Sequence, residues 1–293
     1  MKILVTGARG FTGIHFIEAA RALGHETISL AANLNDARAL EKEVLAAAPE
    51  MVAHLAGISF VASKDEEAFY RVHALGTSSL LNALLKLPIK PQKVLLASSA
   101  TVYGNSPNPF SVEDQELKPI DHYAISKVAM EEMAKTFMDR LPIIIARPFN
   151  YTGHGQKGNF LIPKFVRHFA EQIPSIELGN LEVEREFNDV EMICSAYLAL
   201  LQFGVASQIY NVSTGNARSL KQVMRTLIEL TGHPIDIKIN PDFVRASEVH
   251  RMCGNPSKLM ALMQEHGLTL PIPTLEETLT RMLIGAKSNI IHP

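Results

Sequence analysis

A tyrosine and a lysine four residues apart carry the clearest chemical signal in the sequence. Tyr123 and Lys127 share one face of a predicted helix. A phenol has a pKa of about 10, and a nearby cation lowers it by stabilising the phenolate, so the tyrosine could act as an acid or base near neutral pH. Hydroxyl groups in residues 98–104, at the end of a predicted strand, could hold a reacting oxygen beside it. The pattern predicts proton transfer, although two surface residues could show the same spacing.

Three glycines near the start of the sequence predict a dinucleotide-binding turn. Gly7, Gly10 and Gly13 follow a predicted strand and open a predicted helix. Such glycines allow a tight turn, close approach of a pyrophosphate and close packing of the helix on the strand. The helix N-terminus adds free N–H groups and a partial positive charge. A simple turn is the alternative, but the position between strand and helix favours a phosphate site.

The end of the second predicted strand bears on the choice of nicotinamide cofactor. A carboxylate there would bind the adenosine ribose diol of NAD, but the sequence reads AANL over residues 31–34, without an acid. Arg9, inside the glycine turn, could reach the 2′-phosphate of NADP or remain a solvated surface residue. The sequence thus allows NADP(H) or NAD(H) and leans towards NADP(H).

Short apolar strands alternate with helices through the first half of the chain and must position these residues. The predicted strands are 2–6, 27–31, 51–55, 93–98 and 143–147, and the predicted helices are 13–23, 36–48, 66–85 and 123–140. This alternation predicts right-handed crossovers and a parallel sheet covered on both faces. The fold class is therefore α/β, a doubly wound parallel sheet of the Rossmann type, with ligands at the carboxyl ends of its strands.

The pattern changes after about residue 147, where prolines and glycines interrupt the chain. Helices are predicted over 162–172, 190–203, 220–231 and 275–284, with strand-like segments at 175–178 and 208–212. We expect a dinucleotide-binding domain over residues 1–150 and a smaller substrate-binding lobe over 151–293. The segment of about 190–215 is expected to return to the sheet and supply its last strands.

Composition excludes several classes of protein. Apolar residues make up 47% and charged residues 20%, as in an ordinary globular protein. The 28 basic and 30 acidic residues nearly balance, which argues against nucleic-acid binding. No uncharged apolar run is long enough to cross a bilayer. The two cysteines, Cys194 and Cys253, suit a reducing cytoplasm, and His250 with Cys253 lacks further ligands at metal-binding spacing, so no metal is expected.

Together these motifs resemble those of extended short-chain dehydrogenases/reductases that modify nucleotide sugars. The resemblance lies in the glycine turn, in HLAG, in SSATVYG and in YAISK, and it covers essentially the whole chain. It implies a catalytic hydroxyl at Ser99, a general acid/base at Tyr123, and at Lys127 a residue that binds the nicotinamide ribose and tunes the tyrosine. The residues that it implies around the cofactor, besides Tyr123 and Lys127, are Gly7, Arg9, Gly10, Phe11, Gly13, Asn33, Leu34, Leu55, Ala56 and Gly57.

Motifs in the second half resemble those of family members that act on GDP-sugars. They are RPFN at 147–150, GNLE at 179–182, REFNDV at 185–190 and RASEV at 245–249. The resemblance implies that Arg185 and Arg245 contact the pyrophosphate or ribose. It also implies that Glu248 contacts the nucleoside and that Asn150 contacts the substrate. Arginines suit a diphosphate through bidentate hydrogen bonds, and a carboxylate can accept from ribose hydroxyls or a guanine edge.

The resemblance also narrows the reaction. Dehydratases of this family carry acids just after the catalytic hydroxyl, where this chain has Ala100 and Thr101, which cannot do that chemistry. The resemblance favours NAD(P)H-dependent reduction of a GDP-4-keto-6-deoxy-hexose, as in the conversion of GDP-4-dehydro-6-deoxy-D-mannose to GDP-D-rhamnose. A nucleotide-sugar 4-epimerase with bound NAD is the alternative, followed by a non-catalytic nucleotide-binding protein of the same fold.

Two further features concern the helix of Tyr123 and its neighbours. His73 stands where the family carries an asparagine beside the active site, so the proton relay could differ. A set of apolar side chains on the Tyr123 helix predicts either core packing or, as in relatives that dimerise through this helix, a homodimer interface. These side chains are Met130, Met133, Phe137 and Met138.

Overall fold

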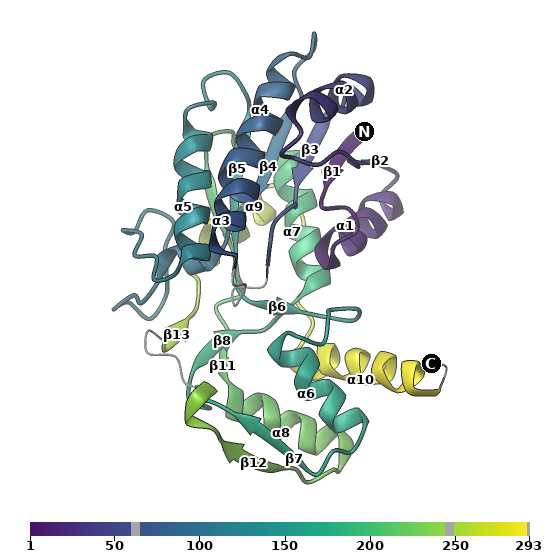
Figure 1. The fold of residues 1–293 in the computed structure, drawn as a ribbon, viewed down its shortest axis with the longest axis vertical. Coiled ribbons are helices and arrows are strands. Elements are labelled where there is room, and N and C mark those ends of the chain that lie inside the picture. The colour runs from purple at the N-terminus through teal and green to yellow at the C-terminus, as the bar shows by residue number, and fades with distance from the viewer. Residues whose placement is uncertain (60–64, 244–248, 292–293) are drawn as a thin grey trace.

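The computed structural model describes residues 1–59, 65–243 and 249–291. The strands of its central sheet are β1 (Lys2–Thr6), β2 (Glu26–Ser29), β3 (Met51–His54), β4 (Lys93–Ala97), β5 (Ile143–Pro148) and β10 (Ile209–Val212). Within the described ranges these six strands are parallel and have the order β2-β1-β3-β4-β5-β10. The predicted fold class, a doubly wound parallel α/β sheet, is confirmed (Figure 1).

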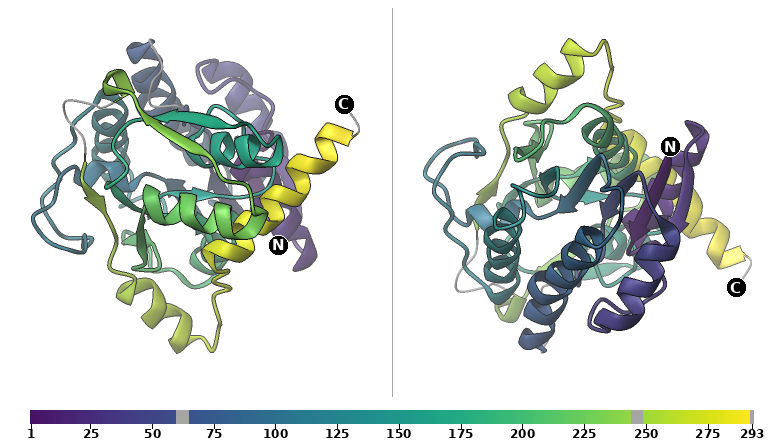
Figure 2. Two further views of the ribbon diagram at one scale, coloured as in Figure 1. Left: turned by 90° about the horizontal axis from the view of Figure 1, so that it is seen from below. Right: turned by 90° about the horizontal axis from the view of Figure 1, so that it is seen from above.

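Helices cover both faces of this sheet because its inner strands are apolar on both sides. Every residue of β3 and β5 is buried, as expected for parallel strands between two helical layers. One layer contains α1 (Phe11–Ala22), α7 (Val190–Phe203) and α9 (Ser257–Glu265). The other contains α2 (Ala37–Ala47), α4 (Thr77–Leu85) and α5 (His122–Lys135). Figure 2 shows the sheet between the two layers.

The helix predicted over residues 66–85 contains a local change of winding. α3 (Glu66–Tyr70) continues into a π-helical segment, Arg71–Gly76, which continues into α4. This segment packs closely on the loop after β2, since a Cβ on Gly76 would lie 2.9 Å from the Cβ of Leu34. The π-helical segment contains His73, which is buried against α5.

A smaller lobe is built around a separate core beneath the sheet (Figure 1). In it α6 (Leu161–Ala170), α8 (Leu220–Thr231) and α10 (Leu275–Ile291) pack with the parallel pair β7 (Ser175–Leu178) and β12 (Asp236–Ile239). Short strands join the lobe to the sheet domain: β6 (Tyr151–Thr152), β8 (Glu184–Glu186), β9 (Asn188–Asp189), β11 (Ala217–Ser219) and β13 (Arg251–Met252). The domain boundary near residue 150 stays a prediction.

The apolar side chains of the Tyr123 helix belong to the core. Met130 and Phe137 are buried, and Met133 and Met138 are partly buried against the same cluster between the sheet and its helices. Core packing, one of the two interpretations of this pattern, accounts for all four. A homodimer stays a prediction.

Candidate active site

Several of the predicted cofactor-binding and catalytic residues converge at the carboxyl ends of β1, β3 and β4. A Cβ on Gly7, in the turn after β1, would lie 2.7 Å from the backbone nitrogen of Ala56, in the loop after β3. A Cβ on Gly57 would lie 3.6 Å from Nζ of Lys127 on α5. That same Nζ donates to the carbonyl oxygen of Ala97, the last residue of β4, at 2.9 Å. One continuous set of contacts therefore joins the three strand ends.

The glycine turn has the tight backbone geometry that its sequence predicts. Gly7 has a φ of +68°, and a Cβ on Gly13 would lie 2.2 Å from the carbonyl oxygen of Gly7, so neither position accepts a side chain. Gly10 caps α1 without a side-chain hydrogen bond, and the first turn of α1 has no acidic residue. The N–H groups at the start of this helix can therefore receive an anion.

A hydrogen-bonded threonine and histidine hold the loop after β3 in place. The Ala56 N–H donates to Oγ1 of Thr6 at 3.1 Å, and the Thr6 hydroxyl meets Nδ1 of His54 at 2.7 Å. Nε2 of His54 meets Oγ1 of Thr77 at 2.8 Å. Burial lowers the pKa of His54 to about 3, so the ring is neutral. In the sequence His54 is the first residue of the HLAG motif, but its role cannot be predicted there because its partners lie on other elements.

The Ser99 side chain lies near enough to the Tyr123 phenol to lower its pKa, so the predicted catalytic hydroxyls lie together. Ser99 is 8% exposed, and its Oγ accepts from the backbone nitrogen of Thr101 at 3.2 Å and from Oγ1 of Thr101 at 2.9 Å. α5 presents the tyrosine in its first turn, where Asp121 caps the helix by accepting from the Ala124 N–H at 2.8 Å.

Burial controls the protonation of the tyrosine and the lysine. It raises the pKa of Tyr123 from its ordinary value, and the Ser99 side chain offsets only part of this effect. Burial therefore opposes the lowering of the tyrosine pKa that a neighbouring cation predicts, and tuning of Tyr123 by Lys127 stays a prediction. Burial lowers the pKa of Lys127 to about 8, with Glu131 opposing the shift. At neutral pH the tyrosine keeps its proton, which suits a proton donor better than a base.

An ion pair beneath these residues is fully buried. Arg147 donates from Nη2 to Oε2 of Glu131 at 2.6 Å and from Nε to Oε1 at 2.9 Å. Ser98 donates to the same Oε1 at 2.5 Å, and Arg147 also donates to the Tyr103 hydroxyl at 2.9 Å. The side chain of Arg147 is 2% exposed, so this member of the RPFN motif supports the site and is not free to contact substrate. Asn150, at the end of the motif, is exposed.

The loop after β2 differs from the expected nucleotide contacts. Leu34 is buried against the π-helical segment, and Asn33 is exposed with its side chain accepting from the Asn35 N–H at 3.0 Å. The carboxylate of Glu43, from α2, accepts from the N–H groups of Ala31 and Ala32, both at 2.7 Å. An acid therefore does stand at the end of β2, but it comes from the next helix and is already hydrogen-bonded to the backbone. Arg9 is exposed.

The predicted substrate residues are placed only in part. Arg185 lies on β8, and its guanidinium donates to the carbonyl oxygens of His250, at 3.3 Å, and of Val249. It therefore contacts the segment that directly follows the RASE residues. Arg245 and Glu248 lie outside the described residues.

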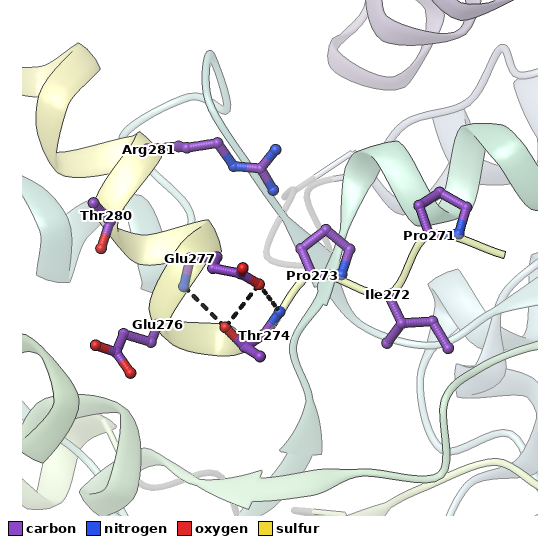
Figure 3. A pocket seen from close by; sticks show the side chains of 8 residues that line it. All are labelled: Pro271, Ile272, Pro273, Thr274, Glu276, Glu277, Thr280 and Arg281. Carbon is purple, nitrogen blue, oxygen red and sulfur yellow. Dashed lines mark hydrogen bonds between the residues drawn. The ribbon is translucent and has the colours of Figure 1, made fainter.

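A hollow of about 750 Å³ lies elsewhere, at the start of α10 (Figure 3). Its lining includes Thr274, Glu277 and Arg281, and none of the predicted site residues. Figure 3 shows the Glu277 carboxylate accepting from the Thr274 N–H, at 2.7 Å, and hydroxyl, at 2.9 Å. Arg281 pairs with Asp189 and Glu191 at 2.7 Å each. These contacts stabilise the end of a helix.

The residues that the structure describes contain no group of three or more histidine, cysteine or acidic side chains that could hold a metal ion. None of their helices combines the length and apolarity that crossing a membrane requires. The cytoplasmic location stays a prediction.

The sheet, the glycine turn and the residues at its edge define a Rossmann-fold enzyme that uses NAD(P). Residues 3–213 match the NAD dependent epimerase/dehydratase family, and the chain belongs to this family. The expected membership of the extended short-chain dehydrogenases/reductases that act on nucleotide sugars is confirmed.

The names of two relatives state that they act on GDP-linked 6-deoxy sugars, and one of the names places the reaction at carbon 4. GDP-6-deoxy-D-talose 4-dehydrogenase of Aggregatibacter actinomycetemcomitans is 34% identical, over 97% of this chain and 99% of its own. GDP-6-deoxy-D-mannose reductase of Pseudomonas aeruginosa is 32% identical, over 88% of this chain and 89% of its own.

Two solved structures share the whole fold. A Burkholderia cenocepacia protein that carries an epimerase label is 39% identical, with a TM-score of 0.92 over 98% of each chain. The structure of RMD from Pseudomonas aeruginosa, complexed with NADPH, is 28% identical, with a TM-score of 0.89 over 98% of this chain and 99% of its own.

The buried ion pair yields a prediction about stability. In Arg147→Met the Glu131 carboxylate stays buried without its partner, which costs about 3–5 kcal/mol of unfolding free energy. Urea denaturation measures the loss. The control is Arg225→Met, because Arg225 pairs with Glu229 at 2.9 Å on the exposed surface, where such a pair contributes about 0–1 kcal/mol. Equal losses in the two variants would contradict the assignment.

Proposed function

We propose that this chain is an NAD(P)H-dependent reductase of a GDP-4-keto-6-deoxy-hexose. The type reaction is that of GDP-6-deoxy-D-lyxo-4-hexulose reductase, which converts GDP-4-dehydro-6-deoxy-D-mannose to GDP-D-rhamnose. One observation carries the proposal. Tyr123 and Ser99 lie together at the carboxyl edge of the sheet, and the two positions after Ser99 hold no acid.

In the proposed reaction the cofactor supplies the hydride, and residues of the chain bind the cofactor and supply the proton. The glycine turn suits a dinucleotide because Gly7 and Gly13 let the backbone pack closely against Ala56 and the start of α1, whose N–H groups can face the phosphates. When bound, NAD(P)H supplies a hydride to C4 of the sugar. Tyr123 donates its proton to the oxygen at C4, and Ser99 hydrogen-bonds the same oxygen where negative charge develops. Carbonyl, hydride and proton together give the alcohol.

The names of the two relatives are compatible with one keto sugar. Talose and mannose differ only in configuration at C4, so oxidation at C4 of either 6-deoxy sugar gives the same 4-keto compound. A reductase of that compound makes one product or the other, according to which face of C4 receives the hydride. The relative matched over 97% of this chain favours the talo product as a second candidate.

The nucleotide is proposed to be GDP. Both relatives carry GDP in their names, and Arg185 contacts the segment that directly follows the RASE residues. A 4-epimerase with bound NAD stays the alternative, and the family and the Burkholderia structure are compatible with it.

Removing the tyrosine hydroxyl tests the chemistry. Tyr123→Phe deletes one oxygen, so folding and cofactor binding should survive. Loss of a general acid typically costs about 100- to 10,000-fold in turnover, and we expect a loss of that order. The assay follows oxidation of NADPH or NADH with GDP-4-dehydro-6-deoxy-D-mannose. Tyr70→Phe is the matched control, because the Tyr70 hydroxyl bonds only the exposed His122 ring in the described contacts, at 2.9 Å.

Several results would decide between the candidates. Full activity of Tyr123→Phe would overturn the role of the tyrosine. If the wild-type protein did not reduce the keto sugar and held oxidised cofactor tightly, the epimerase would be the right candidate. If calorimetric titration showed that UDP binds as tightly as GDP or more tightly, the proposed preference for guanine would be wrong.

We further propose that NADP(H) is preferred and that Arg9 binds its 2′-phosphate. Arg9 is an exposed arginine within the glycine turn, and the RMD structure holds NADPH. A hydrogen bond to a charged group contributes about 1.5–3 kcal/mol, so Arg9→Ala should weaken NADPH binding by about tenfold or more. NADH binding, measured by the same calorimetric titration, should stay unchanged. An equal loss for both cofactors would place Arg9 on the shared pyrophosphate.

A further inference from the structure

A buried histidine lies between the predicted cofactor loop and the helix of Tyr123. His73 is 1% exposed and sits in the π-helical segment Arg71–Gly76. π-Helical turns are rare in proteins, and those that occur are frequently found at functional sites. Both ring nitrogens of His73 have hydrogen-bond partners, and the partners belong to two different elements.

These partners fix the direction of every proton around the ring. The Ile58 N–H can only donate, so Nε2 of His73 accepts from it, at 3.0 Å. The ring proton is then on Nδ1 and is donated to Oγ of Ser126, at 2.8 Å. The Ser126 hydroxyl in turn donates to the carbonyl oxygen of Tyr123, at 2.7 Å. Three hydrogen bonds therefore run in one direction from the loop after β3 to the backbone of the tyrosine.

The ring of His73 also contacts the tyrosine directly. It meets the Tyr123 ring edge-on, with centroids 5.5 Å apart, and stacks on Phe69 at 5.9 Å. Phe69 meets Tyr123 edge-on at 5.7 Å, so three rings pack together. A Cβ on Gly57, one residue before Ile58, would lie 3.2 Å from Nε2 of His73. The histidine therefore touches both the loop and the side chain whose placement matters for proton donation.

The ring stays neutral in this position. Burial, with Lys127 adding to the effect, lowers the pKa of His73 to about 2. A protonated ring would carry a hydrogen on Nε2 facing the Ile58 N–H, where it has no acceptor. The lone pair on Nε2 is used by the Ile58 N–H, and the proton on Nδ1 is used by Ser126. The ring therefore has no free group with which to relay a proton.

We propose that His73 is a positioning residue that couples the Gly57–Ile58 loop to Tyr123 through Ser126. The inference rests on the proposed role of Tyr123 as proton donor. The hydrogen bond at Nδ1 fixes the position of Tyr123, on which turnover depends. The hydrogen bond at Nε2 fixes the position of the Gly57–Ile58 loop, on which cofactor affinity depends.

Two amide variants separate the two sides of the ring. His73→Asn places an amide nitrogen near the position of Nδ1, so it keeps the link to Ser126 and loses the link to Ile58. His73→Gln reaches the position of Nε2, so it keeps the Ile58 link and loses Ser126. Ser126→Ala removes a single oxygen and cuts the same link to Tyr123, which provides a variant with little risk to folding. Ser79→Ala is the matched control, because Ser79 donates to the Leu75 carbonyl on an exposed helix face at 3.1 Å.

Turnover and cofactor affinity are measured separately, by the reduction assay and by calorimetric titration of NADPH. Ser126→Ala and His73→Gln should lower kcat by about 10- to 100-fold, the effect of a misplaced reacting group, with NADPH affinity within about twofold of wild type. His73→Asn should keep kcat within about threefold and weaken NADPH binding. Ser79→Ala should match the wild type in both measurements.

Other results would overturn the inference. Wild-type kcat in Ser126→Ala would show that the link does not position the tyrosine. Equal losses of kcat and affinity in the asparagine and glutamine variants would show that the ring only fills space. If Tyr123→Phe itself kept full activity, the proposed function would fail instead. The titrations need no turnover and would still report on the loop.

Discussion

The buried pair of Glu131 and Arg147 supports the whole reactive edge of the sheet. Glu131 lies one turn after Lys127 on α5, and it accepts hydrogen bonds from Arg147 on β5 and from Ser98, the residue before Ser99. A carboxylate and a guanidinium are stable in an apolar core only when each is paired and hydrogen-bonded. Because one carboxylate ties a helix to two strand ends, the tyrosine, the lysine and the serine are held in fixed relation.

Burial then decides what these residues can do. The same apolar surroundings that require the ion pair favour the neutral forms of the tyrosine and the lysine, raising the pKa of Tyr123 and lowering that of Lys127 to about 8. A protonated tyrosine beside a hydroxyl donor suits delivery of a proton to a carbonyl being reduced. The neutral His73 ring adds position without adding a second charge near Lys127.

Sequence patterns predict what is encoded locally. The helix over 190–203 coincides with α7, and the glycine turn follows from three glycines between a strand and a helix. The roles of His54, Glu43 and Arg147 could not be predicted, because their hydrogen-bond partners come from other elements. A single polar residue forms no repeating sequence pattern that would indicate its partner. His73 drew attention as a departure from the family pattern, but its two hydrogen bonds depend on the packing of three elements.

The central claim is net transfer of hydride to C4 of a GDP-sugar. NADPH carrying deuterium at both C4 hydrogens is incubated with the protein and GDP-4-dehydro-6-deoxy-D-mannose, and the product is examined by NMR. The account predicts one deuterium at C4 of each product sugar, in a single configuration, with one cofactor oxidised per product. Recovery of the keto sugar with no NADPH consumed would contradict it, and so would conversion of GDP-6-deoxy-D-mannose to its C4 epimer in a parallel incubation without added cofactor.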